Sequence, residues 1–263
     1  MPLVGFGTYA LGGETVTESV RTALDAGYRH VDTAEGYRNE RAVAAGMERY
    51  DREDVFLTSK VLPKNLHYES VLEACEASLD RLGTDYLDLY LVHWPNPTIS
   101  LRETLAAMER LHEAGKVRNV GVSNFSKYQL MFALHVADVP IAVNQVEFHP
   151  WFYQADLLEY CEDNDVVLTA AAPLARTDVL DDPTIRDVAE AYDRTPAQVV
   201  LRWQVQKGVA TIPKSSTPDH IRSNLGVGGW ELDEEDVRRI DDTDTEKRVY
   251  MVGLDDDIYG VPR

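Results

Sequence analysis

Residues 55–93, VFLTSKVLPKNLHYESVLEACEASLDRLGTDYLDLYLVH, combine two short apolar runs with an amphipathic stretch between them. The runs, Val55–Val61 and Tyr86–His93, are almost continuously apolar, which is typical of parallel strands covered on both faces. Between them lies Ser70–Leu82, whose apolar residues form one helical stripe: Val71, Leu72, Cys75, Leu79 and Leu82. The stretch therefore predicts a strand, a helix and a second strand.

The same alternation continues along the whole chain. Six further strand candidates are Leu3–Thr8, Tyr28–Asp32, Val117–Val122, Ala142–Glu147, Val166–Ala170 and Val209–Pro213. Eight strands that alternate with helices in 263 residues predict an α/β fold closed into a single (β/α)8 TIM barrel. An open doubly wound sheet is the alternative, which the absence of a G-x-G-x-x-G segment after any strand disfavours. We expect residues 1–263 to form one domain that ends in a short acidic tail, Gly253–Arg263.

Three helix starts carry explicit signals, one of them Thr15 with Glu18 for a helix that ends at Gly27. Thr195, Pro196 and Gln198 supply the N-cap, N1 and N3 residues of a helix that ends before Gly208. Ser100 and Glu103 have the spacing of a capping box at the start of another helix, Leu101–Ala114.

The chain is strongly acidic, with a formal net charge of -19 from 45 acidic and 26 basic residues. This charge repels nucleic acid and anionic membranes, so we expect neither as a partner. Only 7 of the basic residues are lysines, and aspartate outnumbers glutamate. Such a surface stays soluble where salt screens its self-repulsion, which favours a halophilic protein over an ordinary acidic enzyme.

The sequence also indicates a cytoplasmic protein. The two cysteines, Cys75 and Cys161, lie in helical stretches and form no C-x-x-C pair, which is typical of buried thiols in a reducing compartment. No apolar run has the length of a membrane span, and the N-terminus lacks a secretion signal.

Four ionisable residues follow neighbouring strands of the expected barrel: Asp32, Tyr37, Lys60 and His93. Active sites of such barrels lie at the carboxyl ends of the strands, so the four side chains should converge on one rim. Each also has a structural alternative: Asp32 as a helix cap, Tyr37 as a packing aromatic with its hydroxyl in water, Lys60 as a surface charge, and His93 as a satisfied structural histidine.

As a set, these four residues suit proton donation to an oxygen that gains negative charge. A tyrosine holds its proton at neutral pH, and a neighbouring lysine ammonium would lower the tyrosine pKa toward the working range. A carboxylate would keep that cation in place, and a histidine would orient the substrate oxygen. The set contains no strong nucleophile and no metal site.

Seven motifs in order along the chain resemble those of the aldo-keto reductases, most closely the microbial 2,5-diketogluconate reductase and aldehyde reductase branch. They are Gly5-Phe6-Gly7-Thr8, Asp32-Thr33-Ala34-Glu35-Gly36-Tyr37 with Asn39-Glu40, Leu57-Thr58-Ser59-Lys60, Leu91-Val92-His93-Trp94-Pro95, Gly121-Val122-Ser123-Asn124-Phe125, Asn144-Gln145-Val146-Glu147 and Ile212-Pro213-Lys214-Ser215. The resemblance implies reduction of aldehydes or ketones by hydride transfer, with Tyr37 as the acid and Asp32, Lys60 and His93 as its catalytic partners.

The resemblance also implies an extended nicotinamide cofactor across the barrel mouth. Ser123, Asn124 and Gln145 would hold its carboxamide, and Lys214, Ser215 and Thr217 would hold its adenosine phosphate. Ser123-Asn124 can also be read as a helix N-cap. The full set of expected cofactor residues is Gly7, Thr8, Asp32, Ser123, Asn124, Gln145, Ala171, Pro173, Leu174, Lys214, Ser215, Thr217, His220 and Asn224.

The sequence departs from the family pattern at two cofactor positions. Ala171 stands where the family commonly has an aromatic that stacks on the nicotinamide. His220 stands where the family has an arginine for the 2′-phosphate of NADP, and a neutral histidine is a poorer phosphate partner. NADPH is the expected cofactor because Lys214 remains, with NADH as the alternative.

Tyr9, His93 and Trp94 are the expected substrate contacts, and Tyr9, Trp94 and Tyr37 indicate an aromatic-walled pocket for a small carbonyl compound. We expect a monomer or a weak oligomer. A non-catalytic, nicotinamide-binding regulatory barrel of the same family is the alternative function, which the intact set of four residues disfavours. A different, phosphate-binding barrel enzyme is disfavoured by the lack of carboxylate clusters for a metal.

Overall fold

The computed structural model describes residues 1–250 and contains eight parallel strands in the order β1 to β8. The strands are β1 (Phe6–Gly7), β2 (His30–Asp32), β3 (Phe56–Val61), β4 (Leu89–Val92), β5 (Val120–Ser123), β6 (Ile141–Glu147), β7 (Val167–Ala171) and β8 (Ala210–Thr211). Backbone hydrogen bonds from Gly5 N to Thr211 O (2.8 Å) and from Thr211 N to Leu3 O (2.7 Å) join the last strand to the first. The eight predicted strands and the (β/α)8 barrel are therefore confirmed.

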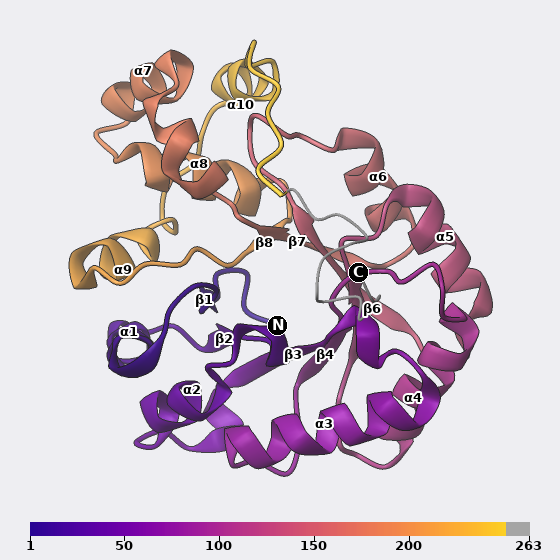
Figure 1. Ribbon diagram of the computed structural model, residues 1–263. Coiled ribbons are helices and arrows are strands. Elements are labelled where there is room, and N and C mark those ends of the chain that lie inside the picture. Colours follow the sequence, from indigo (N-terminus) through magenta and orange to yellow (C-terminus); the bar gives the residue numbers. More distant parts are fainter. Residues whose placement is uncertain (251–263) are drawn as a thin grey trace, which may run out of the picture.

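Helices surround the strands on the outside, as Figure 1 shows. The helices are α1 (Gly13–Ala26), α2 (Glu40–Met47), α3 (Tyr68–Leu82), α4 (Leu101–Glu113), α5 (Lys127–Val136), α6 (Ala155–Asp163), α7 (Pro183–Ala191), α8 (Pro196–Gln206), α9 (Pro218–Asn224) and α10 (Glu234–Asp241). Four 3-10 segments are η1 (Glu35–Tyr37), η2 (Arg52–Asp54), η3 (Pro63–Asn65) and η4 (Ala175–Asp181). The predicted tail, Gly253–Arg263, lies outside the described residues.

One predicted capping box is present and one is wrong, and the helix start predicted at Thr15 is also wrong, because α1 begins at Gly13 with Gly12 as its N-cap residue. Thr195 and Gln198 bond reciprocally at the start of α8, with Pro196 in the first turn. At α4, Ser100 is the N-cap residue but makes no side-chain cap bond. The carboxylate of Glu103 instead accepts a 2.9 Å hydrogen bond from the backbone N–H of Tyr68, at the start of α3. A tertiary partner has therefore replaced the local one.

Most of the core lies between the strands and the surrounding helices. The apolar stripe expected in α3 packs inward, with Val71, Cys75, Leu79 and Leu82 buried, whereas Leu72 is only partly buried. No helix among the residues described is long and apolar enough to cross a membrane.

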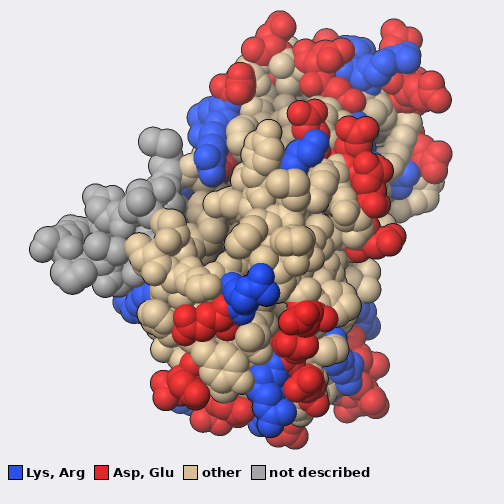
Figure 2. Space-filling view, turned by 90° about the vertical axis from the view of Figure 1, so that its right-hand side faces the viewer, with Lys and Arg blue, Asp and Glu red and all other residues tan. Residues whose placement is uncertain are grey.

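The face that carries α5, on the right of Figure 1, is less charged than its surroundings. Figure 2 shows acidic side chains gathered toward the upper and lower parts of this face, with a broad region between them that carries few charges. Tyr128, Met131 and Phe132 of α5 are large exposed apolar side chains.

Candidate active site

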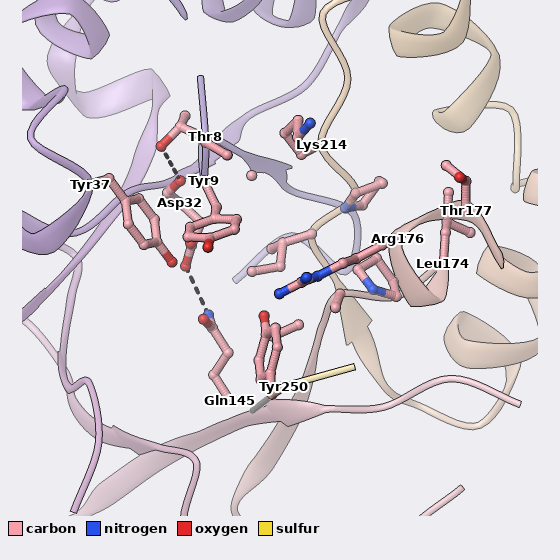
Figure 3. Close-up of a pocket in the computed structure, with 17 residues that line it drawn as sticks. Thr8, Tyr9, Asp32, Tyr37, Gln145, Leu174, Arg176, Thr177, Lys214 and Tyr250 are labelled. Carbon is pink, nitrogen blue, oxygen red and sulfur yellow. Dashed lines mark hydrogen bonds between the residues drawn. The ribbon is translucent and has the colours of Figure 1, made fainter. Parts of the chain in front are cut away.

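A cleft of about 440 Å³ opens at the carboxyl ends of the strands (Figure 3). Its walls come from β1, β2 and β6 on one side and from the segments after β7 and β8 on the other. The lining residues are Gly7, Thr8, Tyr9, Ala10, Asp32, Tyr37, Gln145, Ala171, Ala172, Pro173, Leu174, Arg176, Thr177, Ile212, Pro213, Lys214 and Tyr250. Ten of the residues expected at the site from the sequence thus line one cavity.

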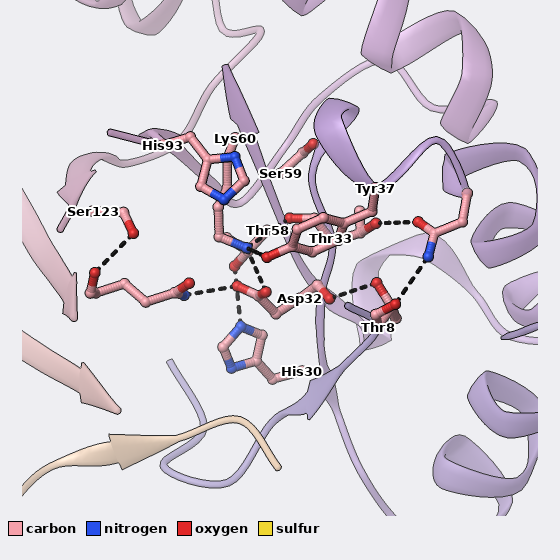
Figure 4. A network of polar contacts seen from close by, with 12 residues as sticks. Thr8, His30, Asp32, Thr33, Tyr37, Thr58, Ser59, Lys60, His93 and Ser123 are labelled. Atoms are coloured by element: carbon pink, nitrogen blue, oxygen red, sulfur yellow. Dashed lines mark hydrogen bonds and ion pairs between the residues drawn. The ribbon is translucent and has the colours of Figure 1, made fainter. Parts of the chain in front are cut away.

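Lys60 is the centre of a buried polar network at the base of this cleft (Figure 4). Its ammonium donates to Asp32 Oδ1 at 2.5 Å, to the backbone oxygen of Thr33 at 2.9 Å and to Tyr37 Oη at 3.3 Å. The side chain is 0% exposed, so the interpretation of Lys60 as a surface charge is wrong. Asp32 and Tyr37 also line the cleft, whereas Lys60 lies behind them.

Both carboxylate oxygens of Asp32 are occupied by side chains from other strands. Oδ1 accepts from Lys60, and Oδ2 accepts a 2.8 Å hydrogen bond from Gln145 Nε2 of β6. The helix-cap interpretation of Asp32 is therefore wrong. These contacts fix Asp32 as the link between the lysine of β3 and the amide of β6.

The loop that carries Tyr37 is tied to its neighbours by Asn39. The Asn39 amide donates to the backbone oxygens of Thr8 and Leu11, both at 2.9 Å, and its side-chain oxygen accepts from Thr33 Oγ1 at 3.0 Å. Because these bonds join the segments after β1 and β2, they fix the backbone on which Tyr37 stands.

Glu40, the next residue of the same motif, supports the neighbouring strand. Its buried carboxylate accepts from Ser59 Oγ and from Arg81 Nε, each at 2.6 Å. Ser59 precedes Lys60 on β3, so this contact helps to hold the lysine at its place in the network. The Asn39-Glu40 motif is thus explained by support of the site.

Burial and nearby charge keep Tyr37 protonated. Burial and the negative charge of Asp32 raise the pKa of Tyr37 well above its ordinary value. The expected net lowering of this tyrosine pKa toward the working range is therefore wrong, because burial and the charge of Asp32 dominate. Burial also lowers the pKa of Lys60, and Asp32 opposes that effect. Tyr37 consequently has the character of a neutral acid throughout the neutral range.

His93 faces Tyr37 across the same network. Its ring centroid lies 5.6 Å from that of Tyr37 in an edge-on arrangement. Burial, and secondarily the charge of Lys60, lower the pKa of His93 well below its ordinary value. The ring is therefore neutral at neutral pH, and its buried Nδ1 has no partner among the described residues. A neutral imidazole can donate one hydrogen bond to a carbonyl oxygen.

The three residues expected to hold a carboxamide are neighbours but differ in exposure to the cleft. Ser123 Oγ donates to the Gln145 backbone oxygen at 2.8 Å, and Asn124 Nδ2 donates to the His93 backbone oxygen at 2.9 Å. Of the three, only Gln145 lines the cleft. The interpretation of Ser123-Asn124 as a helix N-cap is wrong, because Ser126 caps α5 with a full capping box.

The segment after β8 places the expected phosphate residues at the far end of the cleft. Lys214 is exposed and lines the cleft, and Ser215 Oγ accepts a 3.1 Å hydrogen bond from the Thr217 backbone N–H. His220 is exposed on α9, whereas Asn224 is buried at its end. These last four residues do not line the cleft itself.

Gly7 is explained by a close approach of two strands. A Cβ atom at this position would lie 2.6 Å from the backbone oxygen of Ile212. The cleft wall between β1 and β8 therefore requires glycine here.

Sequence reasoning missed several cleft residues, above all Arg176, Thr177 and Tyr250. Arg176 and Thr177 lie in η4 with left-handed φ values of 56° and 84°, which no residue pattern announces. Figure 3 shows the Arg176 guanidinium directed into the cleft. Tyr250 follows α10 in the chain, and only its aromatic side chain could have indicated from the sequence that it belongs to the cleft.

The aromatic wall expected from the sequence contains Tyr9 and Tyr250, together with Tyr37. The rings of Tyr9 and Tyr37 have centroids 5.2 Å apart, and Trp94 lies 6.1 Å from Tyr250. Trp94 thus borders the wall through Tyr250 and does not line the cleft. No group of acidic, cysteine or histidine side chains in the described part of the chain could hold a metal ion.

Comparison with known proteins gives consistent matches. The profile of the Aldo/keto reductase family matches residues 3–245. Glyoxal reductase of Bacillus subtilis (strain 168) is 42% identical over 252 residues, which cover 95% of this chain and 91% of that protein. The 9,11-endoperoxide prostaglandin H2 reductase of Trypanosoma cruzi is 40% identical, covering 95% of this chain and 90% of that protein.

Solved structures agree in fold. An aldo-keto reductase from a Medee basin deep-sea metagenome library superposes with a TM-score of 0.93 at 39% identity, covering 95% of this chain and 94% of that chain. The aldose reductase of Schistosoma japonicum gives a TM-score of 0.89 at 33% identity, covering 95% and 91%.

Proposed function

Because the chain belongs to the aldo/keto reductase family, we propose that it reduces aldehydes or ketones to alcohols with NADPH, and that Tyr37 donates the proton. The family carries oxidoreductase activity on small carbonyl compounds with nicotinamide cofactors. Cofactor preference, the proton donor and the residue roles are the parts that we propose.

One observation supports the proton donor above all. The hydroxyl of Tyr37 is at the cleft wall, 3.3 Å from an ammonium that is itself paired with a buried carboxylate. A buried phenol with a raised pKa holds its proton until an oxygen beside it becomes basic. The Lys60 ammonium can then stabilise the phenolate that remains, because its charge is close and poorly screened.

The other members of the network act on position and charge. Asp32 holds Lys60 charged at its place, and Gln145 fixes the second oxygen of Asp32. His93 is neutral, so it can donate a hydrogen bond to the substrate oxygen and does not compete as an acid. The substrate carbonyl would therefore lie between Tyr37 and His93.

The shape and charge of the cleft fit an extended dinucleotide. Its lining runs from Gln145 and Asp32 past Pro173 and Leu174 to Lys214, with a cation at the far end for a phosphate. A nicotinamide bound here supplies the hydride. Gln145 would hold the carboxamide end, with Ser123 and Asn124 beside it, and Lys214 would hold the phosphate end.

We propose a modest preference for NADPH over NADH. Lys214 provides one cation near the expected 2′-phosphate, whereas His220 provides an imidazole, which cannot make the bidentate phosphate contact of an arginine. Arg222 lies two residues further along α9, and its exposed guanidinium pairs with Asp219 at 3.1 Å. The preference should therefore rest mainly on one lysine.

Small aldehydes, α-keto aldehydes and sugar-derived ketones fit the aromatic-walled cleft. The first of the relatives above is named for glyoxal, which favours small dicarbonyl compounds as the first substrates to test. We further propose a single-domain cytoplasmic enzyme that acts as a monomer or weak oligomer, without nucleic acid or membrane partners.

A substrate panel tests this function directly. Glyoxal, methylglyoxal, an aromatic aldehyde and a ketose should each be offered with NADPH and with NADH, and cofactor oxidation followed by absorbance. We expect turnover with at least one carbonyl and a higher kcat/KM with NADPH. NADPH binding without turnover of any compound would support the regulatory barrel instead.

A further inference from the structure

We propose that Glu147 is a positioning residue that anchors the C-terminal segment, residues 243–250, and thereby sets Tyr250 as a specificity-determining wall of the cleft. Glu147 ends β6 and does not line the cleft itself. The inference rests on the proposed function in so far as the cleft binds the carbonyl substrate.

The Glu147 carboxylate accepts hydrogen bonds from two consecutive backbone N–H groups of that segment. Oε1 accepts from the Val249 backbone N–H at 2.6 Å, and Oε2 accepts from the Tyr250 backbone N–H at 2.8 Å. His149 Nε2 also lies 2.9 Å from Oε1, so this oxygen has two partners. Since Glu147 is 2% exposed, little water competes for these bonds.

The carboxylate is ionised in this setting. Burial acts to raise the pKa of Glu147, but the hydrogen bonds from His149, Val249 and Tyr250 outweigh it and hold that pKa below its ordinary value. Bonds from N–H groups to an ionised carboxylate are stronger than neutral ones. Glu147 is therefore a strong anchor for the chain at neutral pH.

Weaker contacts align the rest of the segment along the loops after β6 and β7. The Lys247 backbone N–H donates to Trp151 O at 2.8 Å, and Thr243 Oγ1 donates to Pro150 O at 3.2 Å. The Lys247 ammonium contacts Asp178 Oδ2 at 2.6 Å on the surface. These contacts bring the chain to Glu147, which holds its last two described residues.

The anchored residue, Tyr250, stands directly at the site of the proposed chemistry. Its ring lines the cleft that Tyr37 and Tyr9 also line, and Trp94 packs beside it. Figure 3 shows Tyr250 projecting into the cleft between Gln145 and Arg176. A substrate whose carbonyl reaches Tyr37 must therefore place its substituent near this ring, so Tyr250 should discriminate among substituents.

Limited trypsin digestion of the full chain tests the anchor without any activity assay. Trypsin cuts after Lys247 and Arg248, which lie in the anchored segment, so cleavage there reports local release. We expect Glu147→Gln to raise the cleavage rate at these two sites by about tenfold or more, since charge-assisted hydrogen bonds are lost. Mass spectrometry identifies the cuts. Asp178→Asn, which loses only the surface contact, is the matched control and should change the rate much less.

Steady-state kinetics test the link to specificity. Glu147→Gln and Tyr250→Ala should each raise KM for an aromatic aldehyde more than KM for glyoxal, because the Tyr250 ring bounds the space for the larger substituent. If Glu147 acts through Tyr250, the double variant should show the selectivity of Tyr250→Ala alone.

The two arms separate the inference from the proposed function. If the wild-type protein turned over no carbonyl compound with NADPH, the proposed function would be refuted. The trypsin experiment would still test whether Glu147 anchors residues 243–250. The role of Glu147 would be overturned if trypsin cut the Glu147→Gln variant after Lys247 and Arg248 as slowly as it cuts the wild type. Additive effects on selectivity in the double variant would also overturn it.

Discussion

The buried pair of Lys60 and Asp32 makes a sharp prediction about stability. Lys60→Met removes the ammonium but keeps the length of the side chain, and it leaves Asp32 as an unpaired carboxylate that is 1% exposed. Removing one partner of a buried ion pair costs about 3–5 kcal/mol. For a domain of this size, that loss should lower Tm by roughly 6–20 °C.

The size of the effect follows from the contacts. The Asp32 carboxylate would keep only the Gln145 hydrogen bond at 2.8 Å, and the Thr33 backbone oxygen would lose its donor. The double variant Lys60→Met with Asp32→Asn removes both charges, so it should be more stable than Lys60→Met alone.

Urea unfolding followed by circular dichroism, at fixed salt, measures the free energies of unfolding of wild type, Lys60→Met, Asp32→Asn and the double variant. Lys116→Met is the control, because its contact with Glu76 is exposed and should contribute only about 0–1 kcal/mol. A Lys60→Met variant within about 1 kcal/mol of wild type, or strictly additive single effects, would refute the buried pair.

Three further outcomes are expected. His220→Arg should bind NADPH about tenfold tighter or more, the gain typical of a charged hydrogen bond, with little change for NADH; an unchanged Kd by fluorescence quenching would place His220 away from the phosphate. Thermal stability and activity should rise with KCl toward molar concentration, because carboxylate repulsion is screened over about 3 Å at 1 M salt, and a Tm that fell steadily would remove the halophilic interpretation. The raised pKa of Tyr37 and the lowered pKa of His93 keep both groups neutral, so kcat for reduction should stay flat from about pH 6.5 to pH 9, and a step near pH 6–7 would mean that His93 ionises in this range.

The barrel could be predicted from the sequence because each strand has a recognisable local pattern of apolar residues. Parallel strands covered on both faces need apolar residues at nearly every position, and such runs are visible without knowledge of their partners. The convergence of Asp32, Tyr37, Lys60 and His93 followed from topology alone, since all four sit at the same end of consecutive strands.

What could not be predicted depends on contacts between distant segments. Glu103 has capping-box spacing but bonds to Tyr68, because the neighbouring helix end offers it a partner that no local pattern reveals. Tyr250 reaches the cleft through Glu147, a residue 103 positions earlier. The direction of the Tyr37 pKa shift could not be predicted because it depends first on burial and then on the nearby charge of Asp32, and sequence spacing reveals neither.

The central claim is that Tyr37 donates the proton from a network held by Lys60 and Asp32. The direct test is single-turnover reduction of glyoxal by the NADPH complex of wild type, Tyr37→Phe and Tyr9→Phe, the last of which removes another hydroxyl from a ring that packs on Tyr37. We predict that Tyr37→Phe slows the step by about 10²–10⁴-fold with NADPH affinity nearly unchanged, and that Tyr9→Phe stays close to wild type. A Tyr37→Phe variant that reduces glyoxal at a near-normal rate would contradict the account.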